Sequence, residues 1–218
     1  MPSKSSLIQQ LREAKIMAVV RAASSNQAIE IAKALLDGGV CGIEITFSTP
    51  NAPQAIETLR ELSENGQLSQ TPFLGAGTVL NSSQARAAYE AGAQFFVSPC
   101  TIPEVIETVN GFSTPCLMLP GAFTPTEIFQ AHALGGDVIK VFPAARLGPD
   151  YFKDLRGPLP HIPLMPTGGV DASNAKMWLQ NGAVALGAGS NILPSGAIQS
   201  GNFQEITKLA RELVEATR

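Results

Sequence analysis

A lysine and a glutamate interrupt two otherwise apolar segments of this sequence. Lys140 stands in the middle of VIKVF (138–142), and Glu44 stands in GIEITF (42–47). A charged group in an apolar segment is costly unless it is paired, solvated or neutralised. One interpretation is a buried lysine–glutamate ion pair, or a lysine whose amine reaches the rim of the fold. The other is that the two residues carry out chemistry, and the pattern alone does not decide between them.

The chemistry that a buried lysine favours is covalent catalysis on a carbonyl compound. Burial disfavours the charged form of an amine, and a neutral amine can attack a carbonyl carbon. The resulting iminium is an electron sink that stabilises an adjacent carbanion or enamine. Glu44 would move protons if it reaches the same centre directly or through one water molecule.

Small and glycine-rich segments elsewhere suggest an anion site. PTGGV contains Gly168 and Gly169 before a helix that we expect to begin near Asp171, and GAGSN contains the hydroxyl of Ser190. Backbone amides at such a helix N-terminus can bind a phosphate group. Thr78, in GAGTV, is a further small polar donor.

Metal and thiol chemistry have less support. The two histidines, His132 and His161, belong to no ligand motif, and we interpret both as structural. Of the three cysteines, Cys41 and Cys116 are expected to pack, and nothing near Cys100 marks it as a nucleophile. Their odd number and wide spacing indicate reduced thiols. We therefore expect neither a metal nor an organic cofactor.

Composition indicates one globular domain spanning residues 1–218, with 44% hydrophobic and 15% charged residues. No apolar stretch reaches the roughly 18 residues that a membrane span needs. The N-terminus lacks the apolar core of a signal peptide, so we expect a cytoplasmic protein. A net charge of −3 without a dense basic run argues against nucleic acid and favours a small-molecule partner.

Helical stretches alternate with short β-rich runs, which is typical of parallel strands joined by helical crossovers. The chain contains eight candidate strands: 16–22, 42–47, 73–79, 94–100, 116–121, 138–144, 164–169 and 184–190. Plausible helix N-caps are Ser24, Asn51, Asn81, Thr124 and Asp171. With an extra helix at 4–14 and a last helix at 202–217, the pattern predicts a (β/α)8 TIM barrel. A doubly wound open sheet is the alternative, although no GxGxxG follows the first strand.

Strand periodicity makes a spatial prediction about the two charged residues. Lys140 shares its face with Val138 and Phe142, and Glu44 shares its face with Thr46. If both faces point inward, an amine and a carboxyl group meet inside one barrel.

Six motifs in order and spacing resemble a known family. GIEITFSTP, GAGTVL, FFVSP, MLPGAFTPTE, IKVFPA and MPTGGV, between about residues 16 and 193, look like those of the class I 2-dehydro-3-deoxy-phosphogluconate aldolases, also described as 4-hydroxy-2-oxoglutarate aldolases. The resemblance implies that Lys140 forms a Schiff base with the substrate C2 carbonyl and that Glu44 is the general acid/base. It also implies substrate-binding positions at Arg21, Thr78, Phe142, Thr167, Gly168, Gly169 and Ser190.

One position departs from the family pattern. Many members carry an arginine just after the E-x-T of the second strand, where it binds the carboxylate of the pyruvyl group, but this chain has Ser48 there. A hydroxyl cannot form a bidentate ion pair, so Arg21 and backbone amides would have to hold that carboxylate.

The resemblance implies reversible cleavage of 2-dehydro-3-deoxy-6-phosphogluconate, a 2-keto-3-deoxy sugar acid phosphate, to pyruvate and glyceraldehyde 3-phosphate. It also implies a homotrimer. The alternatives are a preference for the galactonate epimer or for 4-hydroxy-2-oxoglutarate, a non-covalent sugar-phosphate isomerase or epimerase, and a non-enzymatic sugar-phosphate-binding protein.

Overall fold

The computed structural model describes residues 3–218. The strands are β1 (Ile16–Val20), β2 (Gly42–Thr46), β3 (Phe73–Gly77), β4 (Phe95–Val97), β5 (Leu117–Leu119), β6 (Gly121–Ala122), β7 (Ile139–Val141), β8 (Leu164–Pro166) and β9 (Leu186–Ala188). The helices are α1 (Lys4–Ala14), α2 (Ser25–Asp37), α3 (Ala52–Glu64), α4 (Ser82–Glu90), α5 (Pro103–Asn110), α6 (Pro125–Ala133), the 3-10 turn η1 (Ala144–Arg146), α7 (Asp150–Arg156), α8 (Ala175–Gln180), α9 (Ser195–Ser200) and α10 (Phe203–Ala216).

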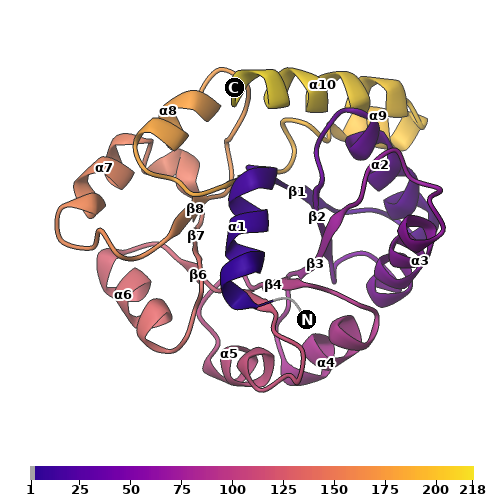
Figure 1. Cartoon of the computed structure of the whole chain (residues 1–218). Helices are drawn as coiled ribbons and strands as arrows, with labels where there is room; N and C mark the ends of the chain where they lie inside the picture. The colour runs from indigo at the N-terminus through magenta and orange to yellow at the C-terminus, as the bar shows by residue number, and fades with distance from the viewer. Residues whose placement is uncertain (1–2) are drawn as a thin grey trace.

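The strands form the predicted (β/α)8 TIM barrel rather than an open sheet. Parallel pairing gives the order β5-β4-β3-β2-β1-β9, and a second stretch has the order β6-β7-β8. Pro120 separates β5 from β6, because proline has no N–H to donate to a ladder. Parallel bridges from Leu164 to Ala183 and from Thr167 to Gly187 close the ring between β8 and β9. Figure 1 shows the surrounding ring of helices.

Side chains inside the barrel form an apolar layer below a polar one. The lower layer includes Met17, Phe73, Phe95, Val138 and Met165, all buried in one cluster with Leu7 and Leu11 of α1. Lys140, two residues after Val138, faces the same interior, and so does Glu44, which is paired with Gly75, two residues after Phe73. A separate apolar layer lies between the strands and the helices. Strand alternation therefore carries both charged residues inward, as the sequence predicted.

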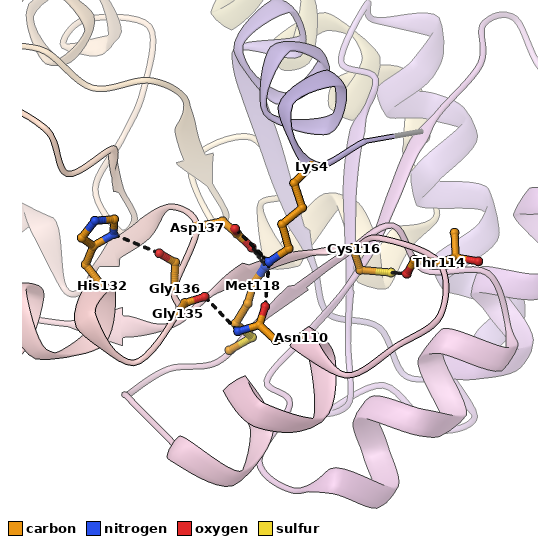
Figure 2. A network of polar contacts seen from close by, with 9 residues as sticks. All are labelled: Lys4, Asn110, Thr114, Cys116, Met118, His132, Gly135, Gly136 and Asp137. Carbon is orange, nitrogen blue, oxygen red and sulfur yellow. Dashed lines mark hydrogen bonds and ion pairs between the residues drawn. The ribbon is translucent and has the colours of Figure 1, made fainter. Parts of the chain in front are cut away.

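Helix α1 crosses one end of the barrel (Figure 1) and closes it. Lys4 Nζ lies 2.8 Å from Asp137 Oδ2 and 2.6 Å from Asn110 Oδ1. Asp137 Oδ2 also accepts the backbone N–H of Met118 at 2.8 Å, so this carboxylate links the helix to two strands. Figure 2 shows Lys4 between these partners. The predicted extra helix is therefore the floor of the barrel interior.

Most of the predicted helix starts are confirmed. The side chains of Ser24, Asn81 and Thr124 accept hydrogen bonds from the first turns of α2, α4 and α6. Asn51 precedes α3 but has left-handed backbone angles and no side-chain cap. The start near Asp171 is wrong, since its carboxylate bonds to Ser173 in a turn and α8 begins only at Ala175.

Within residues 3–218, no helix is both long and apolar enough to cross a membrane.

Candidate active site

Lys140 lies in the barrel interior on β7. Lys140 is only 6% exposed, and its Nζ lies 5.4 Å from the centre of the Phe142 ring. Val138, two residues earlier, belongs to the apolar floor, whereas Phe142, two residues later, is partly exposed at the rim. The amine of Lys140 therefore lies between the apolar floor and the open end of the barrel.

Glu44 on β2 is buried more completely, at 1% exposure. In the described chain neither of its carboxyl oxygens has a hydrogen-bond partner. Burial raises the pKa of this carboxyl group, and the nearby charges of Lys140 and Arg21 oppose that rise only partly. Glu44 thus retains its proton to a higher pH than a solvated glutamate, which suits an acid that must also act as a base.

The two charged residues do not form the buried ion pair that the sequence left open. The ion pairs present among residues 3–218 involve other side chains, and no Lys140–Glu44 contact falls within 4.0 Å. The carboxyl and amine are close enough to influence each other electrostatically but are not in contact. This arrangement leaves the lysine amine free to react.

A pocket of about 390 Å³ opens above Lys140 at the carboxyl ends of the strands. Its lining consists of Val19, Arg21, Lys140, Phe142, Thr167, Gly168, Gly189, Ser190, Leu193, Ser195 and Ile198. The structure thus brings together most of the predicted site residues. The exceptions are Glu44, which lies beneath the surface, and Thr78 and Gly169, which are outside the lining.

Thr167 and Thr78 differ in their relation to this pocket. Thr167 is buried at its edge, and its Oγ1 has no partner in the described chain. Thr78 follows β3 with a φ of 55°, a left-handed conformation that is strained for a β-branched residue. That backbone turn places Thr78 off the pocket wall, a feature that strand alternation could not predict.

The glycine-rich end differs in detail from the sequence prediction. Gly168 and Gly169 have φ values of 92° and 79°, which only glycine adopts readily. Because α8 begins at Ala175, the pair lies in a loop and not at a helix N-terminus. The Gly168 carbonyl accepts the N–H of Ala145 at 3.0 Å, which fixes the loop against the turn after β7. Gly168 and Ser190 face the same pocket.

Arg21 is the one guanidinium group on the pocket lining, and within the described residues it has no ion pair. The hydroxyl of Ser48 is already engaged, because it lies 2.7 Å from Thr46 Oγ1. Thr46 uses its only hydroxyl hydrogen on the Val20 carbonyl at 2.9 Å, so Ser48 donates to Thr46. Ser48 therefore has no free donor for a substrate carboxylate in this arrangement.

Several pocket residues were not predicted. Val19 and Gly189 could have been found, since Val19 shares strand parity with Arg21 and Gly189 lies in the quoted GAGSN motif. Leu193, Ser195 and Ile198 come from the segment after β9, where neither hydrophobic periodicity nor a motif marks them.

The histidines lie away from this pocket. His132 Nδ1 is 3.1 Å from the Gly136 carbonyl, which accepts its hydrogen, and its ring meets that of His161 edge to face. Residues 3–218 contain no cluster of three or more metal-ligating side chains of the His, Cys, Asp or Glu type.

A larger apolar groove of about 710 Å³ lies beside the active-site pocket. Phe142 lines both, so its ring stands between them. Helix α6 contributes the exposed side chain of Phe129, and Leu134 follows at the helix end.

Comparison with known proteins agrees with this geometry. The family model of KDPG and KHG aldolases matches residues 7–209. A 2-dehydro-3-deoxy-phosphogluconate aldolase from Pseudomonas aeruginosa is 35% identical over 94% of this chain and 90% of its own, and one from Treponema pallidum is 33% identical over 96% of both. A KDPG aldolase from Legionella pneumophila, with pyruvate captured at low pH as a covalent carbinolamine, superposes with a TM-score of 0.81 at 28% identity, covering 97% of this chain and 98% of that one.

The barrel with a free amine inside its open end is the architecture of a class I aldolase. The chain belongs to the KDPG and KHG aldolase family and is an aldehyde-lyase.

Proposed function

We propose that this protein cleaves 2-dehydro-3-deoxy-6-phosphogluconate to pyruvate and glyceraldehyde 3-phosphate through a Schiff base on Lys140. The observation that carries the proposal is a buried, unpaired lysine at the bottom of the pocket with a protonatable Glu44 beside it. The relatives from Pseudomonas aeruginosa and Treponema pallidum bear the gluconate name, which favours this substrate over the galactonate epimer and over 4-hydroxy-2-oxoglutarate.

The reaction begins when the neutral amine of Lys140 adds to the C2 carbonyl and forms a carbinolamine. Loss of water gives an iminium, and removal of the proton from the C4 hydroxyl then lets the C3–C4 bond break. The bonding electrons move into an enamine as the aldehyde leaves. A proton delivered to C3 and hydrolysis of the iminium release pyruvate and regenerate the amine. Glu44 is the group that we assign to the proton transfers at the C4 hydroxyl and at C3.

Each end of the substrate has a matching set of groups. The unpaired guanidinium of Arg21 would hold the carboxylate, because Ser48 has no free donor. The loop that carries Gly168 and Gly169 would hold the phosphate through its backbone amides, together with the hydroxyl of Ser190.

The walls between these ends complete the proposed site. Thr167 would bound the pyruvyl group, with Phe142 packed beside the lysine.

Borohydride trapping tests the covalent step. With pyruvate present, reduction is expected to add one reduced pyruvyl group to Lys140, detected by peptide mass spectrometry. Lys140→Met should remove both the adduct and turnover, while Lys153→Met, on α7 away from the pocket, should retain both. Aldol cleavage by the wild-type enzyme without an adduct on Lys140 would contradict the Schiff-base step.

Two further proposals concern the setting of the enzyme. We propose a homotrimer, supported by the exposed apolar side chains of Phe129 and Leu134 along the groove beside the active site. We also propose a cytoplasmic location, supported by the free thiols of Cys41, Cys100 and Cys116.

A further inference from the structure

Glu44 owes its position to a missing side chain on the neighbouring strand. In the parallel pairing of β2 with β3, Glu44 lies opposite Gly75 and Thr46 lies opposite Gly77. The glutamate side chain leans along its strand so that its carboxyl group lies over Gly77. A Cβ atom on Gly77 would come within 2.6 Å of Glu44 Cδ and 2.7 Å of Glu44 Cγ, and it would overlap Oε1.

We infer that Gly77 is a positioning residue, whose lack of a side chain creates the space in which Glu44 holds its carboxyl group beside Lys140. The inference rests on the proposed role of Glu44 as the proton-transfer group. Gly77 itself touches neither substrate nor the reacting atoms, and it acts only through the glutamate.

The backbone of Gly77 does not require glycine for any other reason. It is absent from the residues with positive φ, so alanine could adopt its conformation. Glycine within a strand is less favourable for stability than alanine. The space that the missing side chain leaves for Glu44 explains why glycine stands here. Glycine is therefore required at residue 77 because any larger side chain would collide with Glu44.

The same arrangement recurs on the other side of β1, where β9 pairs with the end of β8. A Cβ atom on Gly187 of β9 would overlap Thr167 Oγ1 and lie 2.9 Å from Thr167 Cβ. Thr167 Oγ1, like both oxygens of Glu44, is buried without a partner in the described chain. Gly77 and Gly187 thus face Glu44 and Thr167, whose buried side-chain oxygens have no hydrogen-bond partner among the described residues.

Substitution of Gly77 by alanine would displace Glu44 and leave the barrel intact. The obstructing atoms belong to a flexible side chain, which can relieve the overlap by changing its rotamer. Gly75, on the same face of β3, provides a contrast, because its Cβ would press on the Phe95 ring with Cζ at 2.5 Å. Phe95 is packed in the barrel floor and cannot move, so Gly75→Ala strains the core instead.

The experiment separates Schiff-base formation from proton transfer with pyruvate alone. Borohydride trapping reports the covalent step, and deuterium incorporation from D2O into the pyruvate methyl group, followed by NMR, reports the proton transfer. Gly77→Ala is expected to keep trapping but to lower deuterium exchange by roughly tenfold to a hundredfold. Glu44→Gln should lower exchange by about a hundredfold or more. Gly75→Ala should lower the melting temperature and leave the ratio of exchange to trapping unchanged.

The double variant tests whether Gly77 acts through Glu44. Adding Gly77→Ala to Glu44→Gln should reduce exchange no further. A reduction as large as in the wild-type background, or wild-type exchange in Gly77→Ala alone, would overturn the inference. If Glu44→Gln itself exchanged normally, the proposed role of Glu44 would fail, a result distinct from either of these. Should Gly77→Ala not fold, Gly77→Ala with Glu44→Ala must recover the fold, and persistent misfolding would refute the steric argument.

Discussion

At the scale of single residues, the site places Glu44 where its charge is unfavourable. Burial raises the pKa of this carboxyl group in the folded protein above the value it has in the unfolded chain. The folded state therefore binds the proton more tightly, and wild-type stability must fall as the pH rises from the ordinary glutamate range toward the raised pKa. Each unit by which the pKa is raised corresponds to about 1.4 kcal/mol.

Glu44→Gln is accordingly expected to make the empty enzyme more stable at neutral pH, on the order of 1 kcal/mol or more, although we expect it to lower turnover. The gain should shrink toward zero as the pH falls through the range in which the wild-type carboxyl group is protonated in both states. Urea denaturation of both proteins between acidic and neutral pH measures this difference. Equal stability of the two proteins at every pH would contradict the raised pKa.

The two charged residues of the barrel interior could be predicted from sequence because each interrupts a local pattern. Lys140 and Glu44 both interrupt apolar runs, and strand parity correctly turned each inward. The role of Gly77 could not be predicted in this way, since it depends on how the side chain of a different strand leans. The departure of Thr78 from the pocket depends on one backbone turn, which carries no sequence periodicity.

At the scale of elements, the candidate strands were found in the right order but with ends that were too long. The run 94–100, for example, contributes only Phe95–Val97 to the ladder. The backbone N–H of Ser98 still donates to the Leu119 carbonyl of β5 at 3.3 Å, but its hydroxyl donates to the Cys100 carbonyl in a local turn, where the pairing ends. Pro99 and Cys100 line the apolar groove instead of pairing, so composition alone could not fix where pairing stops.

Helix α1 provides a prediction at this scale, because it belongs to the closed end of the barrel. Leu11 is fully buried in the interior floor, so Leu11→Ala should cost about 2–5 kcal/mol in the free energy of unfolding. Under conditions where the protein remains folded, kcat should be nearly unchanged, since the catalytic groups lie at the open end. Ile8→Ala, at a partly exposed position of the same helix, is the matched control and should cost less. Urea titration with parallel aldolase assays distinguishes the two effects, and a large loss of kcat in folded Leu11→Ala would contradict this division of the barrel.

At the scale of the whole molecule, the two ends of the barrel have different tasks. The closed end has an apolar interior, and the Lys4–Asp137 ion pair joins α1 to the residues just before β7 (Figure 2). The open end holds the pocket and, across the ring of Phe142, the larger apolar groove. A partner that covers the groove would contact Phe142, which also lines the active-site pocket. We therefore expect assembly to affect access of the substrate to the pocket.

Assembly through the groove gives the last prediction. Phe129 is 52% exposed on the groove side of α6, and a charge there would oppose burial against a second copy. Phe129→Asp should therefore shift the mass measured by light scattering after size exclusion from that of a trimer to that of a monomer. Met177→Asp is the matched control, because Met177 is equally exposed at 52% but lies on α8, outside the groove. Circular dichroism should show the same helix content in both variants, and a trimeric Phe129→Asp would mean that this groove is not the contact surface.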